Sequence, residues 1–267
     1  MSHTPPRPLH VVQITDPHLG TPESGMYGVK LDTGDTLTRV LNDICRTAPD
    51  ADLMLATGDL AEHPVSATYE QLRQLLRGLP MPVHCLAGNH DETKLMEEHL
   101  NAPGLDCAKI ISREDWLLVL LDSTVPGQAG GRLSEHELEF LEETLSRHPA
   151  RNALVCLHHP IVSIGSAWMD RMQLANAEPL FNILDRHPQV RGVLFGHIHQ
   201  DFEATRRGVR LIGSPSTCLQ FLPGSKDFAL DALPPAWRQL TLHPDGRIET
   251  RVHYVDDPRT GQCTASR

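Results

Sequence analysis

The sequence predicts an α/β fold in which parallel strands are covered by helices. Short apolar runs typical of buried strands alternate, in the first third of the chain, with stretches whose leucine, valine and isoleucine residues recur at helical spacing. This strand–helix–strand–helix–strand order favours parallel pairing, because a helix is the usual connection between parallel strands. The chain has 267 residues, 40% of them hydrophobic, and no repeat or linker divides it. We therefore expect a single domain.

Six apolar runs predict the strands that precede residue 200. Each run is short, rich in valine, leucine and isoleucine, and followed by turn residues. The expected strands cover 9–15, 51–58, 82–88, 116–122, 152–159 and 190–199. Between them, the spacing i, i+3, i+4, i+7 predicts helices over Leu37–Ile44 and Leu72–Leu79, and Ser134 with Glu137 forms a capping box that starts another helix.

Beyond residue 200 the pattern changes to antiparallel hairpins. One hairpin is expected over 201–213 with its turn at Arg207-Gly208, and another over 236–255 with its turn at Asp245-Gly246. We expect residues 1–8 to be an N-terminal extension, 9–255 to form the domain, and the polar residues 256–267 to be a loose tail.

The charge and the short apolar runs argue against several classes of function. A net charge of −10 disfavours binding to nucleic acid or to anionic membranes. The longest apolar runs have about six residues, far fewer than the ~20 that span a bilayer, and the N-terminus lacks a signal peptide's apolar stretch. The 6 cysteines form no C-x-x-C pair, as expected of reduced, buried thiols. We expect a cytoplasmic protein that binds neither nucleic acid nor membrane.

Aspartate, asparagine and histidine gather where the expected strands end. Five strand ends carry the sequences TDPH, TGD, AGNHD, LHHP and GHIHQ, in a chain with 16 histidines. Any one of these residues alone would be an ordinary turn residue, but sites in open α/β sheets form beyond the carboxyl ends of the strands. We therefore expect these side chains to converge. The candidates are Asp16, His18, Asp59, Asn89, His158, His197 and His199.

These residue types are metal ligands. Carboxylate, imidazole and amide groups without a thiolate suit Mn²⁺, Fe or Zn²⁺. Seven candidates are too many for one tetrahedral site but suit two metal ions that share a carboxylate. Paired metals about 3.5–4 Å apart recur in phosphate ester hydrolysis, because they clamp both the attacking and the leaving oxygen. The neutral amide of Asn89 would leave such a centre with net positive charge towards a phosphodiester monoanion.

The ordered motifs D-x-H, G-D, G-N-H-D, H and G-H-x-H, which span residues 16–199, resemble those of the calcineurin-like metallophosphoesterases. The resemblance implies a four-layer αββα sandwich with a dinuclear centre. It also implies the ligands of each metal. The first metal would be held by Asp16, His18 and His199, the second by Asn89, His158 and His197, and Asp59 would bridge both.

The resemblance also implies the residues that act on the substrate. His90 would not be a ligand; it would contact phosphate and act as general acid, oriented by a neighbouring carboxylate such as Asp91. Asn89, His90 and His199 are the expected substrate contacts. We expect His63, His84 and His159 to have structural or surface roles.

Sequence outside the metal motifs is similar to that of the bacterial class III 3′,5′-cyclic AMP phosphodiesterases. The similar segments are LDSTVPGQAGGRLSEHELEFL, GSPSTCLQFLPGS and DGRIETRVHYV. The similarity implies that a metal-bridging hydroxide opens cyclic AMP to 5′-AMP while His90 protonates the 3′-oxygen. The alternatives are a glycerophosphodiesterase or broad-specificity phosphodiesterase or phosphatase of the same family, and a non-catalytic scaffold. The expected partner is a small phosphodiester, a homodimer is left open, and residues 216–221 are a candidate border of a base pocket.

Overall fold

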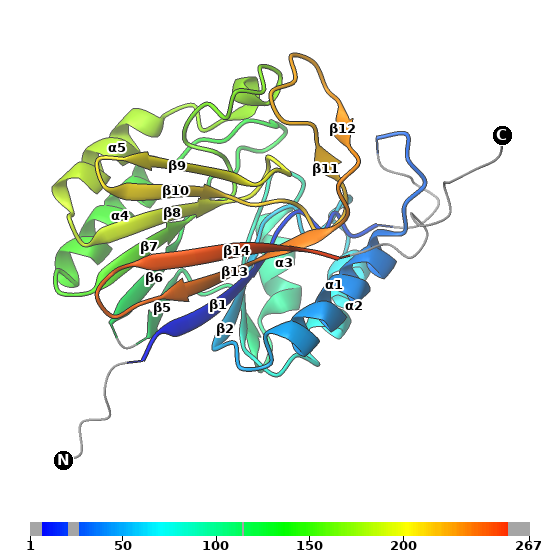
Figure 1. Ribbon diagram of the computed structural model, residues 1–267, viewed down its shortest axis with the longest axis horizontal. Helices are drawn as coiled ribbons and strands as arrows, with labels where there is room; N and C mark the ends of the chain where they lie inside the picture. The colour runs from blue at the N-terminus through cyan, green and yellow to red at the C-terminus, as the bar shows by residue number, and fades with distance from the viewer. Residues whose placement is uncertain (1–6, 21–26, 114, 256–267) are drawn as a thin grey trace.

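Two six-stranded sheets face each other, and helices cover their outer surfaces (Figure 1). The computed structural model describes residues 7–20, 27–113 and 115–255. The four layers confirm the αββα sandwich that the resemblance implies. The helices are α1 (Thr33–Thr47), α2 (Ser66–Leu76), α3 (Thr93–Leu100), α4 (Glu135–Arg147) and α5 (Ala177–Arg186), with a 3₁₀ turn η1 (Met169–Met172).

The first sheet has the strand order β14-β13-β1-β2-β3-β4. Its four N-terminal strands are parallel, and the C-terminal hairpin adds to β1 in the antiparallel sense. The strands are β1 (Leu9–Ile14), β2 (Leu53–Thr57), β3 (Val83–Leu86), β4 (Leu105–Asp106), β13 (Ala236–Leu242) and β14 (Ile248–Tyr254).

The second sheet has the order β5-β6-β7-β8-β10-β9. Its four central strands are parallel, while β5 and β9 pair antiparallel at the edges. The strands are β5 (Ile110–Arg113), β6 (Trp116–Leu120), β7 (Asn152–Cys156), β8 (Val190–Phe195), β9 (Phe202–Arg206) and β10 (Val209–Gly213). A separate ribbon pairs β11 (Gln220–Phe221) with β12 (Leu230–Asp231).

Three apolar clusters hold the layers together. One packs α1, α2 and α3 on the first sheet, and another packs α4 and α5 on the second. The third lies between the sheets, where Leu55 of β2 and Leu154 of β7 are fully buried. Strands covered on both faces need apolar side chains on both, and this explains the continuous apolar runs of the sequence.

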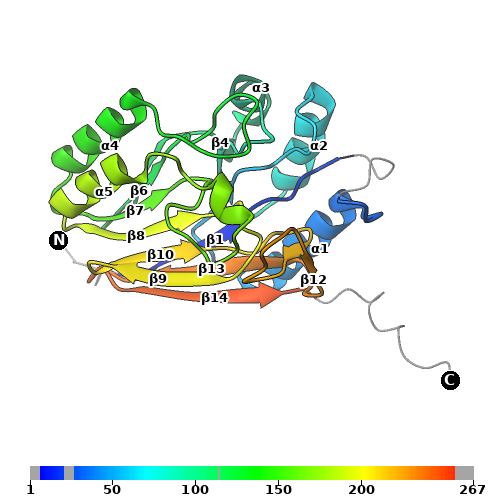
Figure 2. The same cartoon turned by 90° about the horizontal axis from the view of Figure 1, so that it is seen from above.

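A buried arginine joins the sheets where the two hairpins meet. The β9–β10 and β13–β14 hairpins lie near each other in Figure 2 and are joined by a hydrogen bond from Arg238 to the Gly213 carbonyl. Arg238 of β13 is only 1% exposed, and its guanidinium donates to the Gly213 carbonyl and the Ser214 hydroxyl, both at 2.8 Å. It also donates to the carboxylate of Asp201. The charge is therefore paired, as a buried guanidinium requires.

The expected elements form, but several end earlier than the apolar pattern indicates. The strand expected over 190–199 ends at Phe195, and the one expected over 152–159 ends at Cys156. Both hairpins turn where expected, at Arg207-Gly208 and at Asp245-Gly246. Residues 1–6 of the expected extension and the tail 256–267 lie outside the described residues. Within the part of the chain that is described, no helix has the length and apolarity needed to cross a membrane.

Candidate metal centre

All seven predicted ligands lie in loops directly after the carboxyl ends of β1, β2, β3, β7 and β8, and the structure brings them together. The potential ligand atoms form groups in which every atom lies within 4.8 Å of the others. Two of these groups are fully buried. They are Asp16 with His18 and His199, and Asp59 with His158 and His197. His197 and His199 thus belong to different groups.

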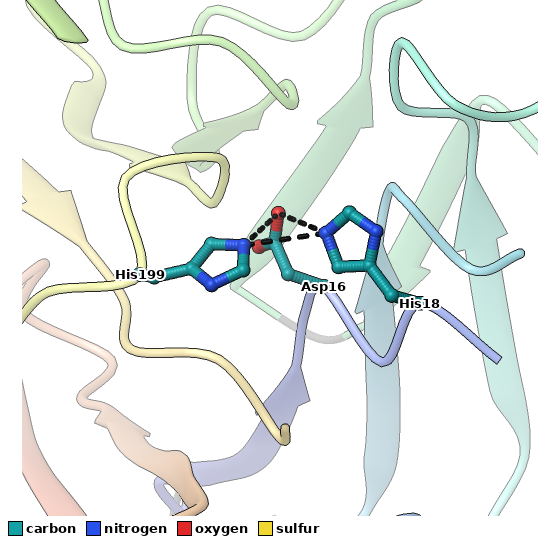
Figure 3. Close-up of side chains that lie close together, drawn as sticks. All are labelled: Asp16, His18 and His199. Carbon is teal, nitrogen blue, oxygen red and sulfur yellow. Dashed lines mark hydrogen bonds and ion pairs between the residues drawn. The ribbon is translucent and has the colours of Figure 1, made fainter. Parts of the chain in front are cut away.

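The first group combines two imidazoles and a carboxylate from opposite sheets (Figure 3). His199 Nε2 lies 3.3 Å from Asp16 Oδ1 and 3.3 Å from His18 Nε2. On the far side of each ring, Nδ1–H donates at 2.8 Å, from His199 to the Leu219 carbonyl and from His18 to the Glu62 carboxylate. In neutral rings both Nε2 atoms therefore carry lone pairs, which face each other and a carboxylate oxygen. Such a set of acceptors fits a cation held between them.

The second group has the same organisation. His158 Nδ1–H donates to the Thr57 carbonyl at 3.0 Å, so that in the neutral ring the Nε2 lone pair faces inward. That Nε2 lies 3.2 Å from Asp59 Oδ2, 3.2 Å from Asn89 Oδ1 and 3.3 Å from His197 Nδ1. The same Asp59 oxygen is 3.6 Å from His18 Nε2 of the first group. Asp59 therefore lies between the two groups, where a bridging carboxylate is needed.

Carboxylates and imidazoles in the cluster shift each other's pKa values. Burial raises the pKa of Asp16, but the facing imidazoles of His199 and His158 outweigh this and bring it to about 2. Burial lowers the pKa of His158, but the carboxylates of Asp59 and Asp16 outweigh this and raise it to about 9. A proton on His158 thus provides the positive charge that these carboxylates require.

The backbone that carries the ligands is strained. Left-handed φ angles are uncommon outside glycine and concentrate at functional sites. Five of the seven predicted ligands have them, with values of 44° to 67° (Asp16, His18, Asp59, His197 and His199). A residue in this conformation cannot continue a strand, which is why β8 ends before His197. A turn after β8, rather than the strand expected over 190–199, therefore carries His197 and His199 to the site.

Glycine permits the close approach of the two ligand loops that follow β1 and β8. A Cβ atom added to Gly196 would lie 2.0 Å from the Thr15 hydroxyl oxygen and 2.6 Å from Asp16 Oδ2. That hydroxyl donates to Asp16 Oδ2 at 2.6 Å. The backbone amide of His197 donates to the same carboxylate oxygen at 3.0 Å. Asp16 is therefore fixed by partners from both sheets.

His90 lies at the rim of the cluster, 31% exposed, and its amide donates to Asp59 Oδ1 at 2.8 Å. The structure does not place Asp91 beside the His90 ring. The Asp91 carboxylate accepts the amides of Leu60, Ala61 and Gly88 and the Tyr69 hydroxyl, and so ties together the loops after β2 and β3. The carboxylate next to the His90 ring is that of Glu62, whose Oε2 lies 3.4 Å from His90 Nδ1.

Glu62 is a site residue that the sequence analysis missed. It contacts both His18 and His90. A single glutamate after the G-D motif does not indicate, in the sequence, which side chains it will contact. The three other histidines assigned structural or surface roles are placed accordingly. His159 contacts the Ser123 hydroxyl at 2.8 Å, His84 contacts Asp106 at 2.7 Å, and His63 is exposed.

A four-layer sandwich with two buried acceptor clusters that share a carboxylate has the features of a dinuclear metal hydrolase. Residues 9–201 match the calcineurin-like phosphoesterase family. The chain belongs to this family.

Named relatives cover nearly the whole chain. The 3′,5′-cyclic adenosine monophosphate phosphodiesterase CpdA of Pseudomonas aeruginosa is 42% identical over 258 residues, which are 96% of this chain and 94% of that protein. The protein of the same name from Escherichia coli K12 is 39% identical over 97% of this chain and 94% of its own length. Among solved structures, a dimetal phosphatase from Danio rerio superimposes with a TM-score of 0.66 and 16% identity, over 94% of this chain and 100% of that chain. This last likeness shows the fold alone.

Proposed function

We propose that this protein is a metal-dependent phosphodiesterase that hydrolyses 3′,5′-cyclic AMP to 5′-AMP in the cytoplasm. The observation that supports this reaction type is the pair of buried acceptor clusters between which Asp59 lies. The substrate rests on the relatives at 38–42% identity, which are named as cyclic AMP phosphodiesterases. A homodimer remains an open expectation.

In this proposal each cluster holds one metal ion. Asp16, His18 and His199 hold the first and Asn89, His158 and His197 hold the second, with Asp59 shared. The donor set suits Mn²⁺, Fe or Zn²⁺. When bound, such ions would supply positive charge for the phosphate oxygens and would lower the pKa of a water that serves as nucleophile.

The protein's own groups complete the reaction. His90 lies in the pocket beside the cluster, and we assign to it the proton that the leaving 3′-oxygen receives. Glu62 orients the His90 ring from its Nδ1 side, so that Nε2 would face the substrate. Asn89 and His199 lie in the same pocket and contact the phosphate in this proposal.

The test is turnover of cyclic AMP by metal-depleted protein with and without added Mn²⁺. We expect metal-dependent release of 5′-AMP. Activity on bis(p-nitrophenyl) phosphate or glycerophosphodiesters without activity on cyclic AMP would retain the reaction type and refute the substrate. Inactivity on all of them, with two metals bound, would favour the scaffold alternative.

A variant separates the role of His90 from that of a ligand. His90→Ala should retain both metal ions and lose mainly kcat, typically by a factor of about 10²–10⁴ for a lost general acid. His136→Ala, which alters an exposed histidine of α4, is the matched control. Loss of metal from His90→Ala would sink the general-acid assignment.

A further inference from the structure

Aromatic side chains gather beside the metal centre. Only 4% of the chain is aromatic, yet four rings form one cluster: Tyr27, Trp168, Phe221 and Phe228. Ring centroids of Tyr27 lie 5.0 Å from Phe228 and 5.5 Å from Phe221, and those of Trp168 lie 5.0 Å from Phe221 and 5.3 Å from Phe228. Three of these pairs pack edge to face, with planes at 76° to 79°, and the Tyr27–Phe228 pair is tilted at 38°.

The cluster forms one wall of the pocket that holds the candidate ligands. Tyr27, Trp168 and Phe221 line the same pocket of about 160 Å³ as His90 and His199. The Phe221 ring stacks on the His199 imidazole, with centroids 4.1 Å apart and planes at 11°. Phe221 is 2% exposed and Trp168 is 9% exposed, so these two rings support the wall from inside.

The outer end of the wall is open to solvent. Tyr27 is 45% exposed and Phe228 is 44% exposed, although they contact each other. Single exposed apolar residues are common, but adjacent exposed rings at the mouth of a pocket mark a binding surface. Tyr27 also has a left-handed backbone, with φ of 50°, which is unusual for a bulky residue.

We propose that this aromatic cluster is a stacking wall, with Tyr27 as its exposed ring, for the base of a nucleotide whose phosphate lies on the metal centre. This inference rests on the proposed phosphodiesterase function and adds the residues that recognise the base of the substrate. Aromatic side chains bind any base through its π-face. A glycerophosphodiester presents no ring to this wall and gains nothing from it.

The wall recognises the face of the base rather than its edge. The Trp168 indole N–H already donates to the Ser225 hydroxyl at 3.1 Å. Apart from the aromatic rings, the candidate ligands and His90, the described residues that line the pocket are Ala129, Met169 and Met172, whose side chains lack polar hydrogen-bonding groups. We therefore expect adenine and guanine nucleotides to bind with similar affinity.

The test compares 5′-AMP with ribose 5-phosphate, which lacks the base, by calorimetry on the Mn²⁺-loaded protein. We expect 5′-AMP to bind about tenfold more tightly, the contribution of about one base–aromatic stack. Tyr27→Ala should bring this ratio close to one, and Tyr27→Phe should restore it because the ring remains. Leu222→Ala, which alters a 43% exposed residue next to β11, should keep the ratio of the unaltered protein.

Several results would overturn the stacking wall. One is equal affinity of the unaltered protein for 5′-AMP and ribose 5-phosphate. Another is an affinity ratio that Tyr27→Ala leaves unchanged. A third is a ratio that falls as far in Tyr27→Phe as in Tyr27→Ala, which would assign recognition to the hydroxyl. If Tyr27→Ala fails to fold, Phe228→Leu provides the same comparison, because Phe228 packs against the other three rings. A more than tenfold preference for 5′-AMP over 5′-GMP would overturn recognition by the base face.

Calorimetry needs no turnover, so the two proposals can fail separately. A preference for 5′-AMP over ribose 5-phosphate that depends on Tyr27, without hydrolysis of cyclic AMP, would refute the proposed function and support the wall. Hydrolysis of cyclic AMP without a preference for 5′-AMP over ribose 5-phosphate would support the proposed function and refute the wall.

Discussion

Glu62 should control how tightly the first metal is held. Its Oε2 accepts from His18 Nδ1–H at 2.8 Å, and this bond fixes the tautomer whose Nε2 lone pair faces the cluster. Glu62→Gln keeps the shape of the side chain but removes its charge. A hydrogen bond to a charged group contributes about 1.5–3 kcal/mol, and a neutral one about 0.5–1.5 kcal/mol. The difference of roughly 1–1.5 kcal/mol predicts about a tenfold weaker metal site.

The assay is competition for Mn²⁺ or Zn²⁺ with a chelator of known affinity. It is combined with the metal content after gel filtration. Glu62→Gln should lose one of its two metal ions at a lower chelator concentration than the unaltered protein does. The reason is that Glu62 contacts His18 and not the ligands of the second group. Glu98→Gln, an exposed glutamate of α3, is the matched control. Equal metal affinity in Glu62→Gln and Glu98→Gln would refute the reasoning.

Three further predictions follow from burial, close approach and charge. Leu154→Ala empties a fully buried position between the sheets and should lower the free energy of unfolding in urea by about 2–5 kcal/mol; a loss below about 1 kcal/mol would contradict it. Gly196→Ala should displace the Thr15 hydroxyl and lower the measured metal content, whereas Gly78→Ala, with no atom near its added Cβ, should not. Metal must displace the proton of His158, whose pKa is raised to about 9, so affinity should rise with pH towards 9. Calorimetry in two buffers should detect the released proton, and an affinity independent of pH between 7 and 9 would contradict this.

The same carboxylate–imidazole pairing makes the stability of the metal-free protein depend on pH. The folded pKa of His158 lies above its usual value of 6.5, so its contribution is complete below pH 6.5 and is lost as the pH rises through about 9. The folded pKa of Asp16 lies below its usual value of 3.8, so its contribution is present above pH 3.8 and is lost as the pH falls towards 2.

The sequence analysis did not indicate α3, α5 or the short strands β4, β5, β11 and β12. The sequence by itself determined the other strands and helices and the seven candidate ligands. Both are local features: an apolar run specifies a buried strand, and the polar residue that follows it must lie at the strand's end. Parallel strands then place the ends of β1, β2 and β3 at one edge of their sheet. The exact strand ends were less predictable, because the left-handed backbone at His197 and His199 comes from the site rather than from the apolar pattern.

Only the tertiary structure decided which residues surround the ligands. Glu62 rather than Asp91 lies beside His90, because the path of the loop after β2 carries the Glu62 carboxylate to the ring while backbone amides bind that of Asp91. Tyr27 and Phe228 are far apart in the sequence, yet their rings are in contact because the β11–β12 ribbon folds back over the site. Contacts between such distant segments depend on how two sheets pack, and no local sequence pattern records that packing.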